Sequence, residues 1–262
     1  MLKSIRVVIL LLIIGIMPVC AHAQLIQVGT GTGAQNTTGA TPYGTFYEDG
    51  KVQYLITKAE LNALGVSSSG SFSSLAFNCT LVPSLPLNGF SIKMAHTNVT
   101  ALTGYVTGTF TTVYTIGTAN VTNGWNTYPF TTNFQYNNVD NIVVEVCFDN
   151  AAWSNPNGTV QSSTTTVNTV YGSFQDVGAG CTAATLTNIT PANSNRPNMR
   201  LMFASTGGGG ANPFTLPPIA NFAYDLGVDT VWVRSPYAFV NTSTGDSASY
   251  WEVIGSSGAK VC

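Results

Sequence analysis

Short segments in which apolar and polar residues alternate recur along the chain, separated by clusters of Gly, Asn, Ser and Pro. Because these segments are rich in Val, Ile, Thr, Tyr and Phe, they are typical of β-strands. The nearly continuous apolar run 141–148 is typical of a strand in the centre of a sandwich. The pattern predicts strands at 44–47, 72–79, 89–96, 110–116, 126–130, 141–148, 168–174 and 199–204, and turns at Asp49-Gly50, Asn88-Gly89, Asn123-Gly124 and Asn157-Gly158.

One helix is predicted, from Thr57 to Leu64. Thr57 is a suitable N-cap, Glu60 stands three residues later as its capping-box partner, and Gly65 ends the helix. Many short strands with a single short helix indicate an all-β fold. For residues 24–204 we therefore predict a jelly-roll-like β-sandwich of two sheets.

The N-terminus has the pattern of a secretory signal. Lys3 and Arg6 precede the apolar run 7–17, and the small-residue site Ala21-His22-Ala23 follows it. The apolar run is shorter than the roughly 20 residues that span a bilayer, which argues against a membrane anchor. We predict a signal peptide at 1–23 with cleavage before Gln24, no transmembrane span after cleavage, and a secreted or cell-surface location.

A Gly- and Pro-rich segment separates two regions of strand pattern. Residues 205–218 contain four consecutive glycines, Gly207 to Gly210, and three prolines, which is typical of a linker. The strand pattern resumes in 219–262, but about 45 residues are few for an independent sandwich. We expect this last region to be a truncated domain.

The composition is that of an extracellular β-protein. Charged residues make up 8% of the chain, whereas about 25% is usual, and Thr and Asn are abundant with 35 and 23 residues. The 44% hydrophobic fraction is too high for a disordered tail, and the few basic residues exclude a polybasic nucleic-acid surface.

Three cysteines in the first domain allow one disulfide bond. Export to an oxidising compartment favours such a bond, and we predict it between Cys147 and Cys181, with Cys79 as a buried free thiol. In the chain-entropy model a bridge of this loop length stabilises the fold by roughly 3–4 kcal/mol. We expect Cys262 to pair outside this chain, and no cysteine spacing matches a zinc site.

The motifs of common hydrolases are missing from the sequence. His96, the one histidine after the predicted cleavage site, ends an alternating segment and is expected at the surface or rim, and neither Gly-x-Ser-x-Gly nor His-Glu-x-x-His occurs. Glu145 and Asp149 lie on one face of one strand about 13 Å apart, too far for a pair of glycosidase carboxylates. Glu145 is expected to be exposed or at the rim. We therefore expect no catalytic residues.

Aromatic side chains with neighbouring polar groups are the candidates for ligand binding, because sugar sites combine apolar walls with a few hydrogen-bonding groups. The candidates are Trp125, Tyr128 and Trp153, with Asp149 and Asn150 near them in sequence. Trp125 and Tyr128 also suit the core, whereas Trp153 lies in a predicted loop and is the better exposed candidate.

Calcium is the one cofactor that the sequence leaves open. Asp149, Asn150 and Asp176 offer loop oxygens, although their spacing matches no EF-hand loop. We expect no other cofactor and no other metal site.

The C-terminal region resembles the first half of a PKD domain. The residues concerned are Pro218-Ile219-Ala220-Asn221-Phe222, Phe239-Val240-Asn241-Thr242-Ser243-Thr244-Gly245 and Ser249-Tyr250-Trp251-Glu252. The resemblance implies an immunoglobulin-like β-sandwich over 219–262, cut short at Cys262. PKD domains serve as spacers or binding modules in secreted and cell-surface proteins.

The first domain is similar to a β-sandwich module at the N-terminal side of large secreted proteins of the Bacteroidetes lineage. This resemblance rests on Leu55-Ile56-Thr57-Lys58-Ala59-Glu60-Leu61, Gly124-Trp125-Asn126-Thr127-Tyr128-Pro129-Phe130, the segment 141–150 and Asn195-Arg196-Pro197-Asn198-Met199-Arg200. It implies further PKD repeats and a C-terminal sorting domain beyond residue 262.

These observations support three functional hypotheses. The first is a non-catalytic, adhesin-like binding or spacer module that contacts extracellular glycans or other cell-surface components. The second is an ancillary N-terminal region of a secreted protease or glycoside hydrolase whose catalytic domain lies outside this chain. The third makes the sandwich itself a carbohydrate binder through Trp153 and its neighbours.

Overall fold

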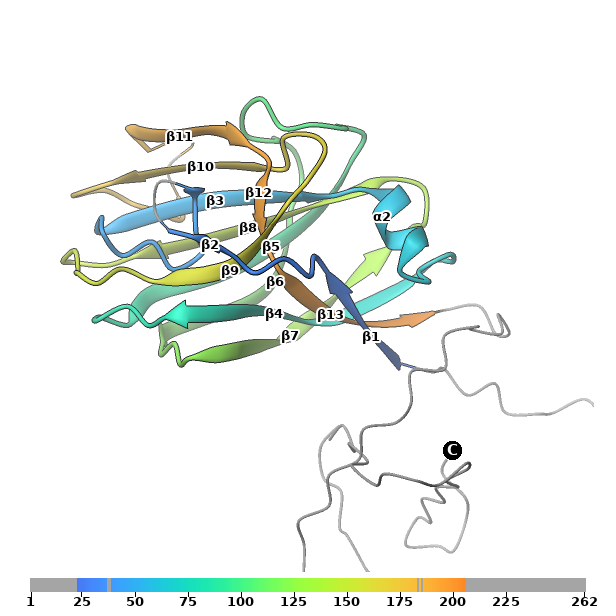
Figure 1. Ribbon diagram of the computed structural model, residues 1–262, viewed down its shortest axis with the longest axis horizontal. Coiled ribbons are helices and arrows are strands. Elements are labelled where there is room, and N and C mark those ends of the chain that lie inside the picture. The colour runs from blue at the N-terminus through green and yellow to red at the C-terminus, as the bar shows by residue number, and fades with distance from the viewer. Residues whose placement is uncertain (1–22, 37–38, 183, 185, 206–262) are drawn as a thin grey trace, which may run out of the picture. The chain divides into compact units, whose positions relative to one another are not determined.

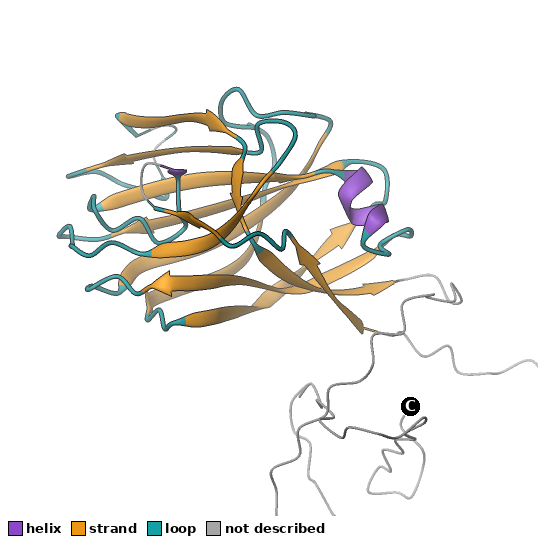
Figure 2. Ribbon diagram, viewed as in Figure 1, coloured by secondary structure: helices purple, strands orange, loops and turns teal. Residues whose placement is uncertain are grey.

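The computed structural model describes residues 23–36, 39–182, 184 and 186–205. The chain divides into two units, 1–209 and 210–262, and all described residues lie in the first. They form two antiparallel β-sheets packed face to face, with one short helix at one end (Figure 1, Figure 2). The predicted all-β sandwich is confirmed. None of the helices in the described residues is long and apolar enough to cross a membrane. The predicted signal peptide, linker and PKD segment lie outside the described residues, apart from Ala23 and Ser205.

The first sheet has seven strands in the order β1-β13-β4-β9-β12, with β7 on the other edge of β4 and β2 beside β9. β13 and β9 pair with successive parts of β4. Phe77 of β4 pairs with Met199, the first residue of β13, and Cys79 of β4 pairs with Val160 of β9. Its strands are β1 (Ala23–Val28), β2 (Gly33–Gln35), β4 (Gly70–Leu81), β7 (Gly124–Tyr136), β9 (Thr159–Thr164), β12 (Asn195–Pro197) and β13 (Met199–Ser205).

The second sheet has six strands in the order β11-β10-β3-β8-β5-β6. All its pairings are antiparallel, and β3 pairs with β8 over its whole length. Its strands are β3 (Asp49–Ile56), β5 (Leu87–Thr97), β6 (Thr111–Ala119), β8 (Asn141–Asp149), β10 (Val170–Gln175) and β11 (Asn188–Asn193).

The hydrophobic core lies between the two sheets. Alternate residues of β3 and β4, such as Tyr54 and Phe77, point inward, and these two rings meet edge to face at 5.8 Å between centroids. Cys79 is a buried free thiol in this core, as predicted. Because side chains on a strand alternate between faces, every second residue of β3, from Val52 to Ile56, contributes to this core.

The strand β3, in the middle of the six-stranded sheet, is buried on both faces. Gln53 donates to the Val106 carbonyl at 3.0 Å and to Glu145 at 2.9 Å. Lys93 forms an ion pair with Glu145 at 3.3 Å. The prediction that Glu145 is exposed or at the rim is therefore wrong, because Gln53 and Lys93 bond to its carboxylate and the residue is buried.

Several local predictions near these strands need correction. Residues 44–47 form turns, not a strand, and Asp49-Gly50 begins β3 instead of forming a turn. Asn88-Gly89 lies inside β5, where Gly89 has a φ of 58°. The strand β3 itself was not predicted, although Lys51-Val52-Gln53-Tyr54 alternates polar and apolar residues as a strand does.

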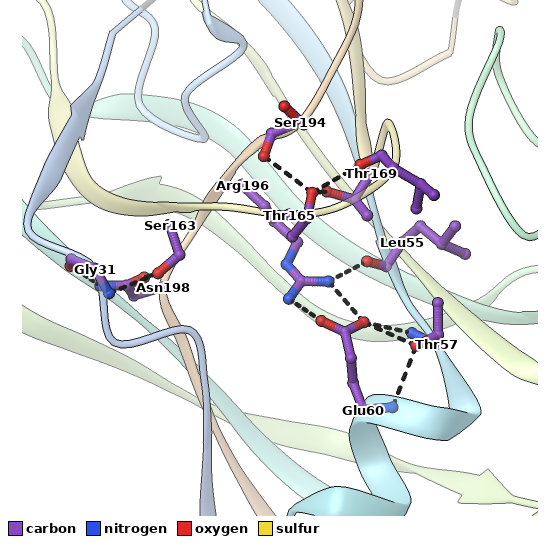
Figure 3. A network of polar contacts seen from close by, with 11 residues as sticks. Gly31, Leu55, Thr57, Glu60, Ser163, Thr165, Thr169, Ser194, Arg196 and Asn198 are labelled. Atoms are coloured by element: carbon purple, nitrogen blue, oxygen red, sulfur yellow. Dashed lines mark hydrogen bonds and ion pairs between the residues drawn. The ribbon is translucent and has the colours of Figure 1, made fainter.

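The helix α2 (Lys58–Ala63) has the predicted capping box. The Glu60 N–H donates to the Thr57 hydroxyl at 3.2 Å, and the Thr57 N–H donates to the Glu60 carboxylate at 2.9 Å. The same carboxylate pairs with Arg196 of β12 at 2.6 Å, and Arg196 also donates to the Leu55 carbonyl of β3 at 2.6 Å (Figure 3). Arg196, only 2% exposed, therefore joins the helix and one strand from each sheet.

Candidate functional site

Two loops meet at the end of the sandwich opposite α2 (Figure 1). The helix α2 follows the last residue of β3, whereas these loops lie next to the first residue of β3. The first loop precedes β3, and the second follows β8. The Ser154 N–H donates to the Thr45 carbonyl at 2.6 Å, and the two hydroxyls of these residues are 2.7 Å apart. The Asn150 N–H donates to the Glu48 carbonyl at 2.9 Å. Hydrogen bonds on both sides of Trp153 therefore fix its backbone.

Three aromatic residues on these loops form a cluster that we call the aromatic platform: Phe46, Tyr47 and Trp153. The centroid of the Phe46 ring lies 6.0 Å from that of Trp153 and 5.4 Å from that of Tyr47. Tyr47 stacks on the buried Phe174 of β10 at 6.0 Å, which anchors the platform to the core. Trp153 is 56% exposed and Phe46 48% exposed. The predicted exposure of Trp153 is confirmed.

An open pocket of about 400 Å³ adjoins the platform. Its apolar wall includes Phe46, Tyr47 and Ile189, and its amide groups come from Asn36, Asn157 and Asn188. A second open pocket of about 510 Å³ has Asn36, Thr190 and Pro191 in common with the first and adds further amides from β2, β11 and β12. None of the described residues that line either pocket carries a charge.

The other predicted ligand-binding residues lie elsewhere or have structural roles. Trp125 on β7 is covered by the Arg200 guanidinium, whose carbon lies 4.1 Å from the centre of the indole ring. Tyr128 is buried, and its hydroxyl is 2.8 Å from that of Tyr43. The buried Asn150 accepts a hydrogen bond from the Asn88 N–H at 2.7 Å. Of the predicted set, only Trp153 belongs to the platform.

Asp149 is brought together with a residue that we did not predict as part of a site, Asp49. The two are directly opposite each other in the β3–β8 ladder. Burial, and to a smaller extent the neighbouring Asp149 carboxyl, raise the pKa of Asp49 from its usual 3.8 to about 7. Asp49 begins β3, so the strand geometry and not a sequence motif creates this pair.

The residues proposed as calcium ligands do not converge on one site. The Asn150 side chain bonds to Asn88 and to the Pro86 carbonyl, and Asp176 accepts a hydrogen bond from the Glu48 N–H at 3.2 Å. Within the described residues, no three His, Cys, Asp or Glu side chains are placed to hold a metal ion.

The geometry around His96 is that of a packed rim residue. Its Nε2 atom accepts a hydrogen bond from the Asn137 N–H at 3.3 Å, and its ring lies 4.8 Å from Phe134 and 6.2 Å from Tyr136. Burial lowers the pKa of His96, which favours its neutral form. This nitrogen is already occupied by a backbone donor, so it is not available as a general base in this arrangement.

The predicted disulfide bond between Cys147 and Cys181 is confirmed, with the two Cα atoms 5.2 Å apart. It ties the loop after β10 to the outer face of β8. Cys262 lies outside the described residues.

Phe46 is not among the predicted ligand-binding residues, because the sequence pattern predicts a strand at 44–47. The available signal was the pair of adjacent aromatic residues, Phe46-Tyr47, close to two glycines, Gly44 and Gly50, which is unusual for a buried strand. Comparisons with protein-family models, curated proteins and solved structures give no significant match.

Proposed function

We propose that this domain is a non-catalytic binding module of a secreted, cell-surface protein and that it contacts extracellular glycans through the aromatic platform. The observation that carries the proposal is the exposed ring pair Phe46 and Trp153, held on two loops that are hydrogen-bonded to each other. Large exposed aromatic side chains usually mark a contact site, because water contact with their faces is unfavourable.

The platform needs little reorganisation to bind a ligand. The hydrogen bonds of Asn150 and Ser154 fix the chain on both sides of Trp153, and Phe174 supports Tyr47 from below. A preformed surface loses little conformational entropy on binding, so more of the contact energy is available as affinity.

The chemistry next to the platform suits an uncharged, hydroxyl-rich ligand. Sugar rings present apolar C–H faces that pack on aromatic rings and hydroxyls that bond to amides. The adjoining pocket combines Phe46 and Tyr47 with the amides of Asn36, Asn157 and Asn188. A strongly anionic ligand is less suitable, because Glu48 lies in the first of these loops and Asp149 ends β8, directly before the second.

Two further features support the secreted, non-catalytic part of the proposal. The Cys147–Cys181 disulfide bond fits an oxidising compartment. Hydrolysis by a nucleophile requires a base within hydrogen-bonding reach, and His96 faces the Asn137 backbone instead.

The test is a glycan array with the purified protein, followed by calorimetric titration of the best ligand with wild type and Trp153→Ala. We expect the variant to bind at least about tenfold more weakly, a loss of about 1.4 kcal/mol, because it removes the largest exposed ring of the platform.

The matched control is Val139→Ala. Val139 is an exposed apolar residue in the loop before β8, whereas Trp153 lies in the loop after β8, so the two are at opposite ends of that strand. The control should bind like wild type. If the folded wild-type protein binds no glycan, or if Trp153→Ala keeps full affinity, the proposal is wrong.

A further inference from the structure

The Asp49–Asp149 pair places two carboxyl groups side by side at the edge of the same loops. Asp49 is the first residue of β3, and Asp149 is the last residue of β8. Directly opposed residues in an antiparallel pair have Cβ atoms about 5 Å apart, and two like charges in these positions repel each other. The two carboxyl groups are within hydrogen-bonding reach of each other.

Asp49 has no partner that would balance a negative charge. It is 1% exposed, and neither carboxyl oxygen accepts a regular hydrogen bond from any described residue. The charged groups that act on it most are both acidic, Asp149 and Glu48. A nearby backbone N–H, that of Gly180, favours the charged form, but it does not form a regular hydrogen bond.

The other charged groups nearby are engaged elsewhere. Lys51, two residues along β3, reaches the Ala184 carbonyl at 3.5 Å, and Glu145 and Lys93 are the charged groups that act on it. Asp176, after β10, accepts the Glu48 N–H. A buried carboxylate without a cation or donors is costly, so Asp49 needs a proton to remain buried.

A loop closes over Asp49, and it has no room to shift inward. A Cβ atom on Gly178 would lie 2.7 Å from an Asp49 carboxyl oxygen, and one on Gly180 would lie 2.1 Å from the Phe148 carbonyl oxygen. The Cys147–Cys181 disulfide bond fixes the far side of the loop. We call residues 176–182 the cover loop.

Glu48 connects the cover loop to the aromatic platform. Its carboxylate accepts the Val177 N–H at 2.9 Å, and its backbone N–H donates to Asp176 at 3.2 Å. Its carbonyl accepts the Asn150 N–H at 2.9 Å, which is one of the bonds that hold the two platform loops together. Any movement of the cover loop therefore acts on the residue beside Tyr47.

We propose that Asp49 and Asp149 share one proton. We propose further that this proton stabilises the closed cover loop and the contact between the two platform loops, so that both depend on pH. When the proton is lost to solvent, the second negative charge on the pair favours an open loop that hydrates Asp49. The proposal goes beyond glycan binding and does not depend on it. The raised pKa of Asp49, about 7, agrees with this arrangement.

The sign of the pH dependence follows from linkage. The closed loop holds the proton up to about pH 7, whereas an open, hydrated Asp49 releases it near its usual 3.8. The equilibrium constant for opening of the cover loop therefore increases by up to about tenfold per pH unit as the pH rises from about 4 to about 7. Above about pH 7 it levels off.

The experiment is amide hydrogen exchange on the intact protein between about pH 5 and pH 8, with each rate divided by the intrinsic rate at that pH. We expect protection of residues 176–182 to fall by up to about a hundredfold from pH 5 to pH 7 in wild type. Asp49→Asn, which keeps a donor but has no charge, should show nearly constant protection. Asp140→Asn, which removes a carboxylate in the loop before β8, should behave like wild type.

Two outcomes would overturn the proposal. One is pH-independent protection in wild type, or the same slope in Asp49→Asn. The other is recovery of protection at pH 7 by calcium and not by Asp49→Asn, because the pair would then bind a metal ion and not a proton. If Asp49→Asn does not fold, Asp149→Asn removes the same repulsion from the exposed member, and a slope unchanged from wild type would equally refute the proposal.

Discussion

The buried ion pair between Arg196 and Glu60 provides the sharpest test of the forces that hold this sandwich together. The two partners differ in burial, since the Arg196 side chain is 2% exposed and that of Glu60 is 34% exposed. Removal of either partner leaves the other without its counter-charge. We therefore expect Glu60→Ala to cost more stability than Arg196→Met.

The magnitudes follow from what each variant leaves behind. Glu60→Ala leaves a buried guanidinium with only the Leu55 carbonyl as an acceptor, which costs about 3–5 kcal/mol, and the lost capping box adds about 1 kcal/mol. Arg196→Met leaves Glu60 able to hydrate, so its cost is closer to about 2–3 kcal/mol. Once Arg196 is gone, Glu60→Ala should add only the capping loss of about 1 kcal/mol.

The assay is urea unfolding of wild type, both single variants and the double variant at about pH 7. This pH suits the test because, although burial alone would raise the pKa of Glu60, hydrogen bonds from Arg196 and Thr57 hold it below its usual 4.5. The contribution of Glu60 is thus fully present above pH 4.5 and is lost as the pH falls through the lowered pKa. Additive costs, within about 0.5 kcal/mol, would refute the reasoning.

Two further predictions concern the cover loop and its surroundings. Asp49→Asn should unfold at nearly the same free energy as wild type near pH 4 and become the more stable protein as the pH rises to about 7, by up to about 4 kcal/mol. Over this range Asp49 of the unfolded wild type releases its proton, whereas the buried Asp49 of the folded protein has to keep it, so the folded wild type loses stability relative to the unfolded chain. A constant difference across pH in urea titrations would contradict this. Replacing both Cys147 and Cys181 by alanine should lower the free energy of unfolding by about 2–4 kcal/mol, since the bridge closes a loop with a sequence separation of 34. The cover loop should also become open to limited proteolysis. Unchanged stability and protease resistance would show that the cover loop is held without the bridge.

Local chemistry explains which parts of the fold were predictable. The helix α2 was predicted to within a residue, because Thr57, Glu60 and Gly65 cap it with contacts that are local in sequence. The strands β4 and β8 have long apolar patterns, and their existence is confirmed. The count of cysteines and the expected compartment predicted one bridge, and the long loop 150–180 that it would close favoured Cys147 and Cys181 as its partners.

Long-range contacts explain the failures. Alternation of polar and apolar residues in β3 suggests one face open to water, but the polar residues Lys51 and Gln53 are buried as well, because loops that are distant in sequence cover them. Glu145 was expected at the surface because a carboxylate on a strand usually faces water, but Lys93 and Gln53 pair with it instead.

The sequence by itself determined the all-β class of the described domain, the helix α2 and the exposure of Trp153, and it favoured the Cys147–Cys181 bridge. Only the tertiary structure decided what surrounds Trp153, because Phe46 is more than a hundred residues away in the chain and meets it through the hydrogen bonds between Ser154 and Thr45. The same holds for Asp49 and Asp149, which become neighbours through the register of β3 and β8. Strand register and loop packing bring together residues that are far apart in sequence, and no local pattern encodes these pairings.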